Sequence, residues 1–214
     1  MTSPAPRITL YDFEISASCY KIRLLLSLLK LDYERVTVNF YPGFEHRQPA
    51  FLKVNPLGQL PAIRDGDVVL RDAQAILTYL ARKYDPAARW LPSEPAALGE
   101  VMMWLFFAAS ELSAAPAARL HAMLDFPADA AAVKQAARKA FRIMNDAMTA
   151  REHDGAAWFV GDQATLADVA LFPAIALSRD FGVEHDEYPA LRHWMRRVRG
   201  LSGFIAMPGI PDYY

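Results

Sequence analysis

The ten residues from Val54 to Ile63 (Val-Asn-Pro-Leu-Gly-Gln-Leu-Pro-Ala-Ile) limit how this chain can fold more than any other stretch. Asn55 and the proline after it form a turn signal. Since proline has no N–H for a strand ladder, Pro61 belongs at the first position of a strand, and the bond before it can adopt the cis form. The backbone of Leu60 is then turned outward, with its N–H and C=O free. The stretch therefore predicts a loop that binds an extended peptide backbone.

The residues on either side of this loop alternate between strand and helix patterns. The expected elements are strands at 8–13 and 33–40, a helix at 19–30 between them, and a hairpin over 62–70 followed by a helix from Asp72. The hairpin is predicted by the turn pair Asp65-Gly66. A strand–helix–strand unit with one crossover forms a parallel pair with a right-handed connection. We therefore expect a thioredoxin-like βαβ–ββα unit, with a four-stranded mixed sheet and helices on both faces.

The second half of the chain has a different composition. Three prolines between residues 85 and 95 are typical of a linker, and the residues beyond them are alanine-rich and helical in pattern. We therefore predict a thioredoxin-like domain at 1–85, a linker at 86–95 and an all-helical domain at 96–214.

Within this second half, apolar periodicity predicts helices at 98–112, around 133–148, from 165 to about 177, and at 188–199. Pro116 is expected to kink or end the first of these helices. Thr165 and Asp168 form a capping-box pattern at the start of the third, which is a folding feature and not a catalytic pair.

Composition excludes several classes of protein. Of the 214 residues, 53% are hydrophobic and 22% charged, as in folded globular proteins, and the formal net charge of −1 gives no footprint for nucleic acid or an anionic membrane. The longest apolar run, Val101–Phe107, is too short for a bilayer span. A single cysteine, Cys19, excludes an internal disulfide framework. The histidines show no metal-ligand spacing and no glycine-rich phosphate loop is present, so we expect neither a metal nor a nucleotide.

Four segments together resemble the soluble glutathione transferase family: Ser16–Arg23, Phe51–Pro61, Asp72–Leu80 and Phe159–Asp168. They occur in family order and cover nearly the whole chain. The resemblance implies a cytoplasmic homodimeric enzyme that activates the thiol of its co-substrate, glutathione, for attack on a small apolar electrophile. It also implies that the Leu60 backbone pairs with the cysteinyl backbone of glutathione, which is β-augmentation on a small scale.

Ser16 is the expected catalytic residue, because the chain resembles bacterial-like, serine-type members of the family. A hydroxyl donor at the N-terminus of a helix lowers the pKa of a thiol by hydrogen bonding and through the helix dipole. The alternative is that Ser16 only caps the helix. Ser18 lies closer to the apolar periodic run, so we expect Ser18 to be the cap.

The resemblance also implies which residues bind the two ends of glutathione. An acidic residue followed by Ser or Thr usually binds the γ-glutamyl end; here Asp72 keeps the charge, whereas Ala73 removes the hydroxyl. One hydrogen bond lost to a charged group costs on the order of 1.5–3 kcal/mol if neither Gln74 nor water replaces it, so we expect weak glutathione binding and weak activity, or a ligand other than glutathione. His46 and Gln59 are expected near the glycyl carboxylate, although His46 is also compatible with a solvated loop histidine.

Two other functions compete with the transferase. Ser16-x-x-Cys19 has the spacing of a redox Cys-x-x-Cys motif, so Cys19 is an alternative nucleophile for a glutathione-dependent thiol reductase. The structural alternative for Cys19 is a small buried hydrophobe. A non-catalytic protein that binds glutathione or another ligand on the same scaffold is the second competitor, and Ala73 favours it.

Overall fold

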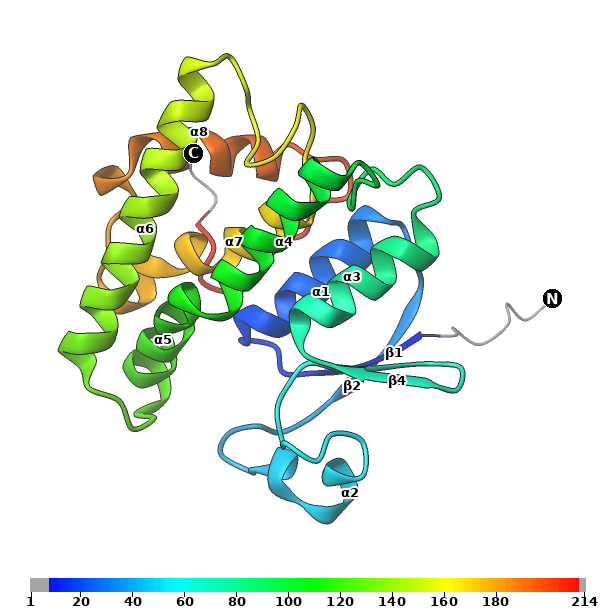
Figure 1. Ribbon diagram of the computed structural model, residues 1–214. Coiled ribbons are helices and arrows are strands. Elements are labelled where there is room, and N and C mark those ends of the chain that lie inside the picture. The colour runs from blue at the N-terminus through cyan, green and yellow to red at the C-terminus, as the bar shows by residue number, and fades with distance from the viewer. Residues whose placement is uncertain (1–7, 212–214) are drawn as a thin grey trace.

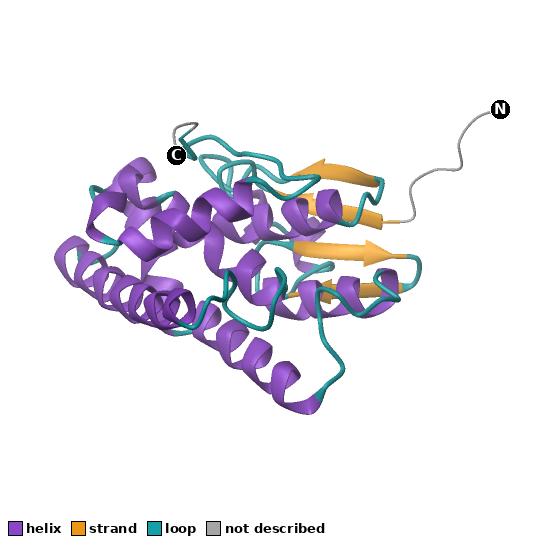
Figure 2. Cartoon of the chain, turned by 90° about the horizontal axis from the view of Figure 1, so that it is seen from above, coloured by secondary structure: helices purple, strands orange, loops and turns teal. Residues whose placement is uncertain are grey.

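The computed structural model describes residues 8–211, which form a small sheet with helices packed beside it (Figure 1). The strands are β1 (Ile8–Asp12), β2 (Tyr33–Thr37), β3 (Ala62–Asp65) and β4 (Val68–Arg71). Their order in the sheet is β2-β1-β3-β4, with β1 and β2 parallel and the other two pairs antiparallel. This is the predicted four-stranded mixed sheet. Figure 2 shows the strands gathered at one side of the molecule and the helices over the rest.

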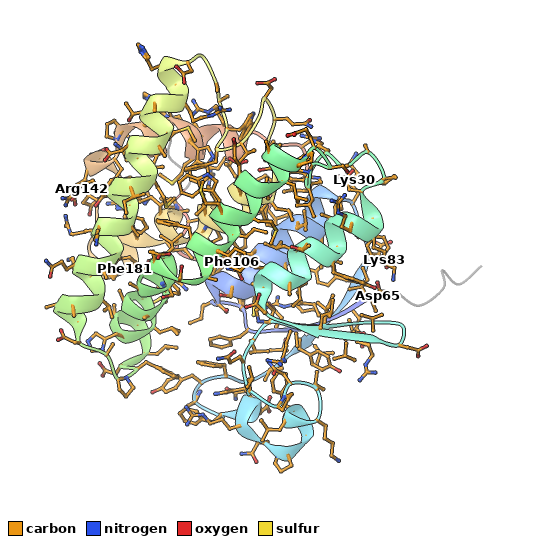
Figure 3. The ribbon with its side chains drawn as sticks, in the orientation of Figure 1. Lys30, Asp65, Lys83, Phe106, Arg142 and Phe181 are labelled. Atoms are coloured by element: carbon orange, nitrogen blue, oxygen red, sulfur yellow. The ribbon has the colours of Figure 1, made fainter. Side chains whose placement is uncertain are left out.

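Two helices, α1 (Ala17–Leu28) and α3 (Ala73–Tyr84), pack together on one face of the sheet, and the short α2 (Pro49–Leu52) lies toward the other (Figure 1). A buried carboxylate, Asp65 at the end of β3, ties α3 to the sheet. It accepts hydrogen bonds from Lys83 at 2.6 Å and from Tyr79 at 2.9 Å. Figure 3 labels Asp65 and Lys83, which lie beside each other. These contacts hold the C-terminal part of α3 against the sheet.

Asp12, the last residue of β1, is fully buried and forms ion pairs with Arg23 of α1 and Arg35 of β2. Arg23 also donates a hydrogen bond of 2.7 Å to the carbonyl of Glu14. An unpaired buried carboxylate is costly, and the two arginines offset the cost of burying Asp12. Together these contacts fix the turn that connects β1 to α1.

The helical half contains α4 (Pro95–Ala109), α5 (Ala114–Leu124), α6 (Ala130–His153), α7 (Leu166–Ala176) and α8 (Pro189–Arg199). Every residue of α7 is buried, and α7 packs against α1 of the first half and against α4 and α8 of its own half. The predicted capping box is present, because Thr165 and Asp168 cap α7 reciprocally. The core is therefore continuous across both halves.

One expectation about the helices is wrong. Pro116 does not kink or end a helix at 98–112; α4 ends at Ala109, and Pro116 lies in the first turn of a separate helix, α5. A proline is tolerated there because the first N–H groups of a helix have no partner inside it. By length and composition alone the 30 residues Pro95–Leu124 qualify as a membrane span, but the structure divides them between two helices and buries 39% of the apolar window.

Candidate functional site

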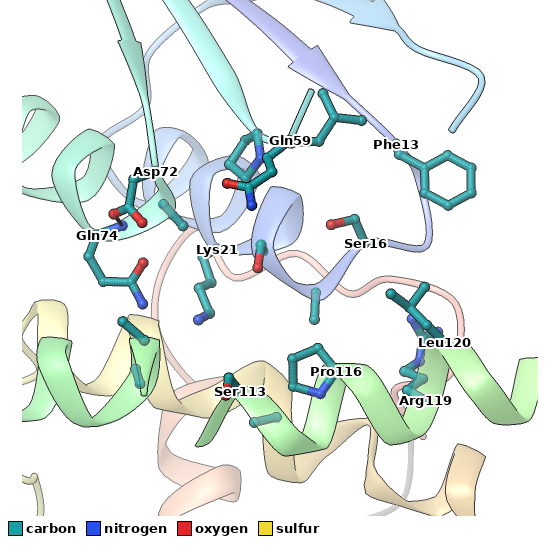
Figure 4. A pocket seen from close by; sticks show the side chains of 18 of the residues that line it. Phe13, Ser16, Lys21, Gln59, Asp72, Gln74, Ser113, Pro116, Arg119 and Leu120 are labelled. Carbon is teal, nitrogen blue, oxygen red and sulfur yellow. Dashed lines mark hydrogen bonds between the residues drawn. The ribbon is translucent and has the colours of Figure 1, made fainter. Parts of the chain in front are cut away.

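A pocket of about 350 Å³ lies between the thioredoxin-like half and the helices α4 and α5 (Figure 4). One wall comes from the turn before α1, from α1 itself, from the loop before β3 and from the start of α3. The opposite wall is mostly apolar and comes from α4 and α5. The lining residues include five of the predicted site residues: Ser16, Gln59, Leu60, Asp72 and Ala73. His46 and Cys19 are not among them.

Ser16 is the N-cap of α1, and its hydroxyl oxygen accepts a hydrogen bond of 3.2 Å from the N–H of Cys19. Ser18 lies inside the helix, so the expectation that Ser18 is the cap is wrong. The helix begins at Ala17, before the apolar periodicity that predicted its start. Ser16 therefore has two properties at once, because its hydroxyl caps the helix and also lines the pocket (Figure 4).

The loop before β3 is held by its own side chains. The amide of the buried Asn55 donates to the carbonyl of Gln59 at 2.7 Å, and its oxygen accepts the N–H of Leu57 at 3.0 Å. Gly58 has φ +59°, and a Cβ there would lie 2.9 Å from the carbonyl oxygen of His46, so only glycine fits.

The Leu60–Pro61 bond at the end of this loop is cis. Within residues 8–211, neither the N–H nor the C=O of Leu60 forms a hydrogen bond with another backbone group. Since Leu60 also lines the pocket, its backbone is open to an extended ligand.

Asp72 is the N-cap of α3 and has a positive φ of 70°, which is uncommon outside glycine. One carboxylate oxygen accepts the N–H of Gln74 at 2.9 Å and that of Ala75 at 3.0 Å. Ala73 presents only a methyl group to the pocket, whereas Gln74 places an amide beside it (Figure 4). This end of the pocket thus combines a carboxylate with a helix N-terminus, which favours an anionic group beside a cationic one.

Lys21 also lines the pocket, although no pattern in the sequence predicts it there. It is 6% exposed and extends from α1 into the pocket (Figure 4). Burial lowers the pKa of Lys21 to about 8, and the negative charge of Asp72 partly opposes this shift. Lys21 follows Tyr20 in an ordinary amphipathic pattern, so no signal in the sequence separates it from a solvated helix lysine.

Arg119 of α5 is a second buried pocket residue that was missed. It forms an ion pair of 2.6 Å with Asp180 and donates a hydrogen bond to the carbonyl of Ile15, the residue before Ser16. Apolar periodicity predicts no helix at 114–124, so no pattern in the sequence places Arg119 beside the turn that carries Ser16.

His46 lies outside the pocket and is buried, so it is not a solvated loop histidine. Its ring stacks on Phe40, a lining residue, with 4.1 Å between ring centroids. Burial, and then the charge of Arg47, lower the pKa of His46. Its proposed contact with a glycyl carboxylate stays a prediction.

Cys19 is fully buried, and burial raises the pKa of its thiol to about 12, so its thiolate is scarce at neutral pH. This environment is that of a small core hydrophobe. Among the described residues, no group of three or more His, Cys, Asp or Glu side chains is arranged to hold a metal ion.

Comparison with known proteins agrees with this geometry. Residues 10–88 match the glutathione S-transferase N-terminal domain, and residues 104–201 match the glutathione S-transferase C-terminal domain. Glutathione S-transferase 1 of Dianthus caryophyllus is 30% identical over 199 residues, which cover 89% of this chain and 86% of that protein.

Solved structures give the same result. A glutathione S-transferase from Pseudomonas fluorescens superposes with a TM-score of 0.84 at 28% identity, covering 94% of this chain and 99% of that one. A glutathione transferase homologue from Lodderomyces elongisporus, with two glutathione molecules per subunit, has a TM-score of 0.82 at 26% identity and covers 92% of this chain and 94% of its own.

The two matched regions are those that form the two walls of the pocket. These comparisons support the transferase, and they do not favour the Cys19-dependent reductase or the non-catalytic binding protein. The chain belongs to the glutathione S-transferase family.

Proposed function

We propose that this protein is a serine-type glutathione transferase of the cytoplasm, in which Ser16 stabilises the thiolate of bound glutathione. The observation that carries the proposal is the convergence of Ser16, Leu60 and Asp72, from three separate segments, on one pocket. The open backbone edge of Leu60 matches the cysteinyl backbone of a γ-glutamyl-cysteinyl peptide. The hydroxyl of Ser16 at a helix N-terminus matches its thiol, and the carboxylate of Asp72 matches its α-ammonium.

In the proposed mechanism, the backbone of Leu60 pairs with the cysteinyl backbone of glutathione, and the carboxylate of Asp72 binds its α-ammonium. The thiol proton leaves to solvent, and the Ser16 O–H donates a hydrogen bond to the resulting thiolate, which the N-terminus of α1 also stabilises. The thiolate attacks an electrophilic carbon, so a C–S bond forms while the bond to the leaving group breaks with its electron pair. Alignment of the two reactants supplies much of the rate enhancement.

The acceptor is proposed to be a small apolar electrophile. The wall opposite Ser16 contains Ala108, Leu112, Pro116 and Leu120, which offer carbon surface and few polar groups. We propose that Gln59 contacts the ligand backbone beside Leu60, and that His46 supports Phe40 or approaches the glycyl end. Ala73 supplies no hydroxyl, so affinity for glutathione is expected to be modest.

A homodimer is also proposed. Met103 and Phe106 on α4 are 56% and 67% exposed, which is unusual for such large apolar side chains. Phe106 is labelled in Figure 3. Both residues lie on the outer face of the helix whose inner face lines the pocket, so a second copy of the chain would bury them.

Light scattering of wild type and Phe106→Glu tests this proposal: a dimer that becomes a monomer supports it, and a monomeric wild type overturns it. Ile143→Glu on α6, at a residue that is 42% exposed, is the control and should leave the assembly unchanged.

The catalytic proposal is tested with wild type, Ser16→Ala and Cys19→Ala, by measuring glutathione binding and conjugation to 1-chloro-2,4-dinitrobenzene. We expect Ser16→Ala to lower kcat/KM by about 100-fold or more and Cys19→Ala to leave it nearly unchanged. Absence of glutathione binding to wild type at millimolar concentration would contradict the proposal. Loss of activity only in Cys19→Ala, with reduction of disulfide substrates by wild type, would favour the reductase.

A further inference from the structure

Lys21 differs from the other buried cations in the described part of the chain because its charge has no partner. Arg23 pairs with Asp12 and Arg119 pairs with Asp180, whereas the ammonium of Lys21 forms no hydrogen bond or ion pair with any other residue in the range 8–211. Burying a charged group without a partner costs folding free energy. A buried cation without a partner on the wall of a pocket therefore indicates that its partner is a ligand.

The surroundings of the ammonium define the charge of that ligand. Figure 4 shows Lys21 reaching from α1 to a position between Gln74, at the start of α3, and Ser113, just before α5. Both neighbours are neutral and polar. The nearest acidic group that influences Lys21 is Asp72, which forms no ion pair with it, and one oxygen of that carboxylate is already occupied by the N–H groups of α3. The ammonium thus faces a space suited to an anion.

We propose that Lys21 is the carboxylate-binding residue of the pocket, and that it pairs with the α-carboxylate at the γ-glutamyl end of glutathione. This inference rests on the proposed function. In the proposed pose the cysteinyl group lies at Leu60 and the γ-glutamyl end lies at Asp72, which is the side of the pocket that Lys21 and Gln74 share. Lys21 then supplies the carboxylate contact that the methyl group of Ala73 does not.

The charges of the amino-acid end match this arrangement. A γ-glutamyl group carries an ammonium and a carboxylate on the same carbon, so it is bound best by a carboxylate and a cation placed side by side. Asp72, the N-cap of α3, and Lys21 of α1 supply these two charges on the same pocket, and they form no ion pair with each other. A ligand carboxylate in the pocket would also pair with the ammonium of Lys21, and such a charge-assisted hydrogen bond is among the strongest in proteins.

The test is calorimetric titration of wild type, Lys21→Met and Lys21→Arg with three ligands. These are glutathione, an analogue whose γ-glutamyl α-carboxylate is amidated, and glutathione ethyl ester, whose glycyl carboxylate is blocked. We expect Lys21→Met to weaken the binding of glutathione and of the ester by about 10- to 100-fold, and to leave the weak binding of the amidated analogue unchanged. Lys21→Arg keeps the charge and should retain most of the affinity.

A second readout separates binding from folding. Lys21→Met removes a buried unpaired charge, so the ligand-free variant should melt at the same temperature as wild type or higher. A residue with a purely structural role would lower the melting temperature instead. Ala73→Ser provides a further check, because a restored hydroxyl should reduce the effect of Lys21→Met on glutathione affinity.

Three results would overturn the inference. The first is unchanged glutathione affinity in Lys21→Met, and the second is equal weakening of all three ligands. The third is a loss confined to kcat/KM for 4-chloro-3-nitrobenzoate but absent for 1-chloro-2,4-dinitrobenzene, which would assign Lys21 to a carboxylate of the acceptor. If wild type binds no glutathione at all, the proposed function fails and this inference with it. If wild type binds glutathione and Lys21 has no effect, only this inference fails.

Discussion

The guanidinium of Arg119 donates a hydrogen bond to the carbonyl of Ile15, which joins α5 of the helical half to the turn that carries Ser16. The same guanidinium is paired with Asp180 and approaches the carbonyl of Pro208 at 3.4 Å. One buried side chain therefore connects the proposed catalytic turn to two distant segments of the C-terminal half. The position of Ser16 depends on residues more than a hundred positions away.

Arg119→Met should lower both stability and activity. Loss of a buried ion pair leaves Asp180 without its partner, so we expect the free energy of unfolding to fall by about 3 kcal/mol, and kcat/KM to fall through displacement of the turn before Ser16. Urea unfolding and steady-state kinetics measure the two effects. Arg138→Met is the matched control, because Arg138 pairs with Glu187 where both side chains are about one-third exposed. That variant should lose no more than ~1 kcal/mol. Equal effects of the two substitutions would contradict the role of Arg119.

Asp168→Asn should be strongly destabilising although it conserves shape. The carboxylate accepts hydrogen bonds from the indole Nε1–H of Trp194 at 2.8 Å, from the N–H of Thr165 at 2.8 Å and from the N–H of Phe159 at 3.3 Å. An amide would direct its own N–H groups at some of these buried donors. We expect a loss of about 2–4 kcal/mol in the free energy of unfolding.

The control for this prediction is Asp129→Asn at the exposed start of α6, where Asp129 caps the N–H of Ala132 at 3.0 Å. Asn and Asp are equivalent caps, so this change should be nearly neutral. A loss at Asp168 no larger than that at Asp129 would show that the buried network contributes little.

The stability difference between wild type and Lys21→Met should depend on pH. Burial lowers the pKa of Lys21 to about 8 in the folded state, from an ordinary value of 10.5. Below pH 8 both states carry the charge, and the folded protein bears its full desolvation cost. Between pH 8 and 10.5 the unfolded state binds more protons than the folded state, so wild type gains stability with pH relative to the variant.

Chemical unfolding at pH 7 and at pH 10 should therefore show the advantage of Lys21→Met shrinking by on the order of 1–3 kcal/mol. The comparison with the variant is needed because the thiol of Cys19, whose pKa burial raises to about 12, shifts stability in the opposite direction at alkaline pH. A difference that is constant across this range would show that Lys21 titrates as a solvated lysine.

Cys19 should be almost inert in the folded protein. With its pKa raised by burial to about 12, the thiolate that reacts with a disulfide reagent is rare at pH 8. We expect the reaction with Ellman's reagent to be at least about 100-fold slower than after unfolding in urea, where the same thiol recovers its ordinary pKa. Rapid reaction of Cys19 under native conditions would favour the thiol reductase.

The parts of this structure that the sequence predicted are those set by local rules. The Asp65-Gly66 hairpin and the Thr165–Asp168 capping box each depend on a few consecutive residues, and both are present. The loop around Pro61 is similar, because a missing N–H has the same consequence in any context. Such features need no knowledge of the rest of the chain.

The parts that were missed depend on contacts distant in sequence. Lys21 becomes a buried pocket residue only when the start of α3 and the segment before α5 lie beside α1. Arg119 reaches Ile15 only through the packing of the two halves. Pro116 is ambiguous in sequence because a proline can end one helix or stand in the first turn of the next. The sequence favours Ser18 as the cap because apolar periodicity locates the middle of a helix better than its first turn.

The hydrogen bond from the Cys19 N–H to the Ser16 hydroxyl oxygen has a consequence for orientation. A serine hydroxyl normally rotates freely, and the entropy of fixing it is lost when a ligand binds. Here the N–H of Cys19 points at the oxygen, so it disfavours the orientations in which the hydroxyl proton points into α1 and favours those that leave the proton available to the pocket. The cap thus preorganises the donor during folding, before any thiol arrives, and binding does not have to restrict that rotation again.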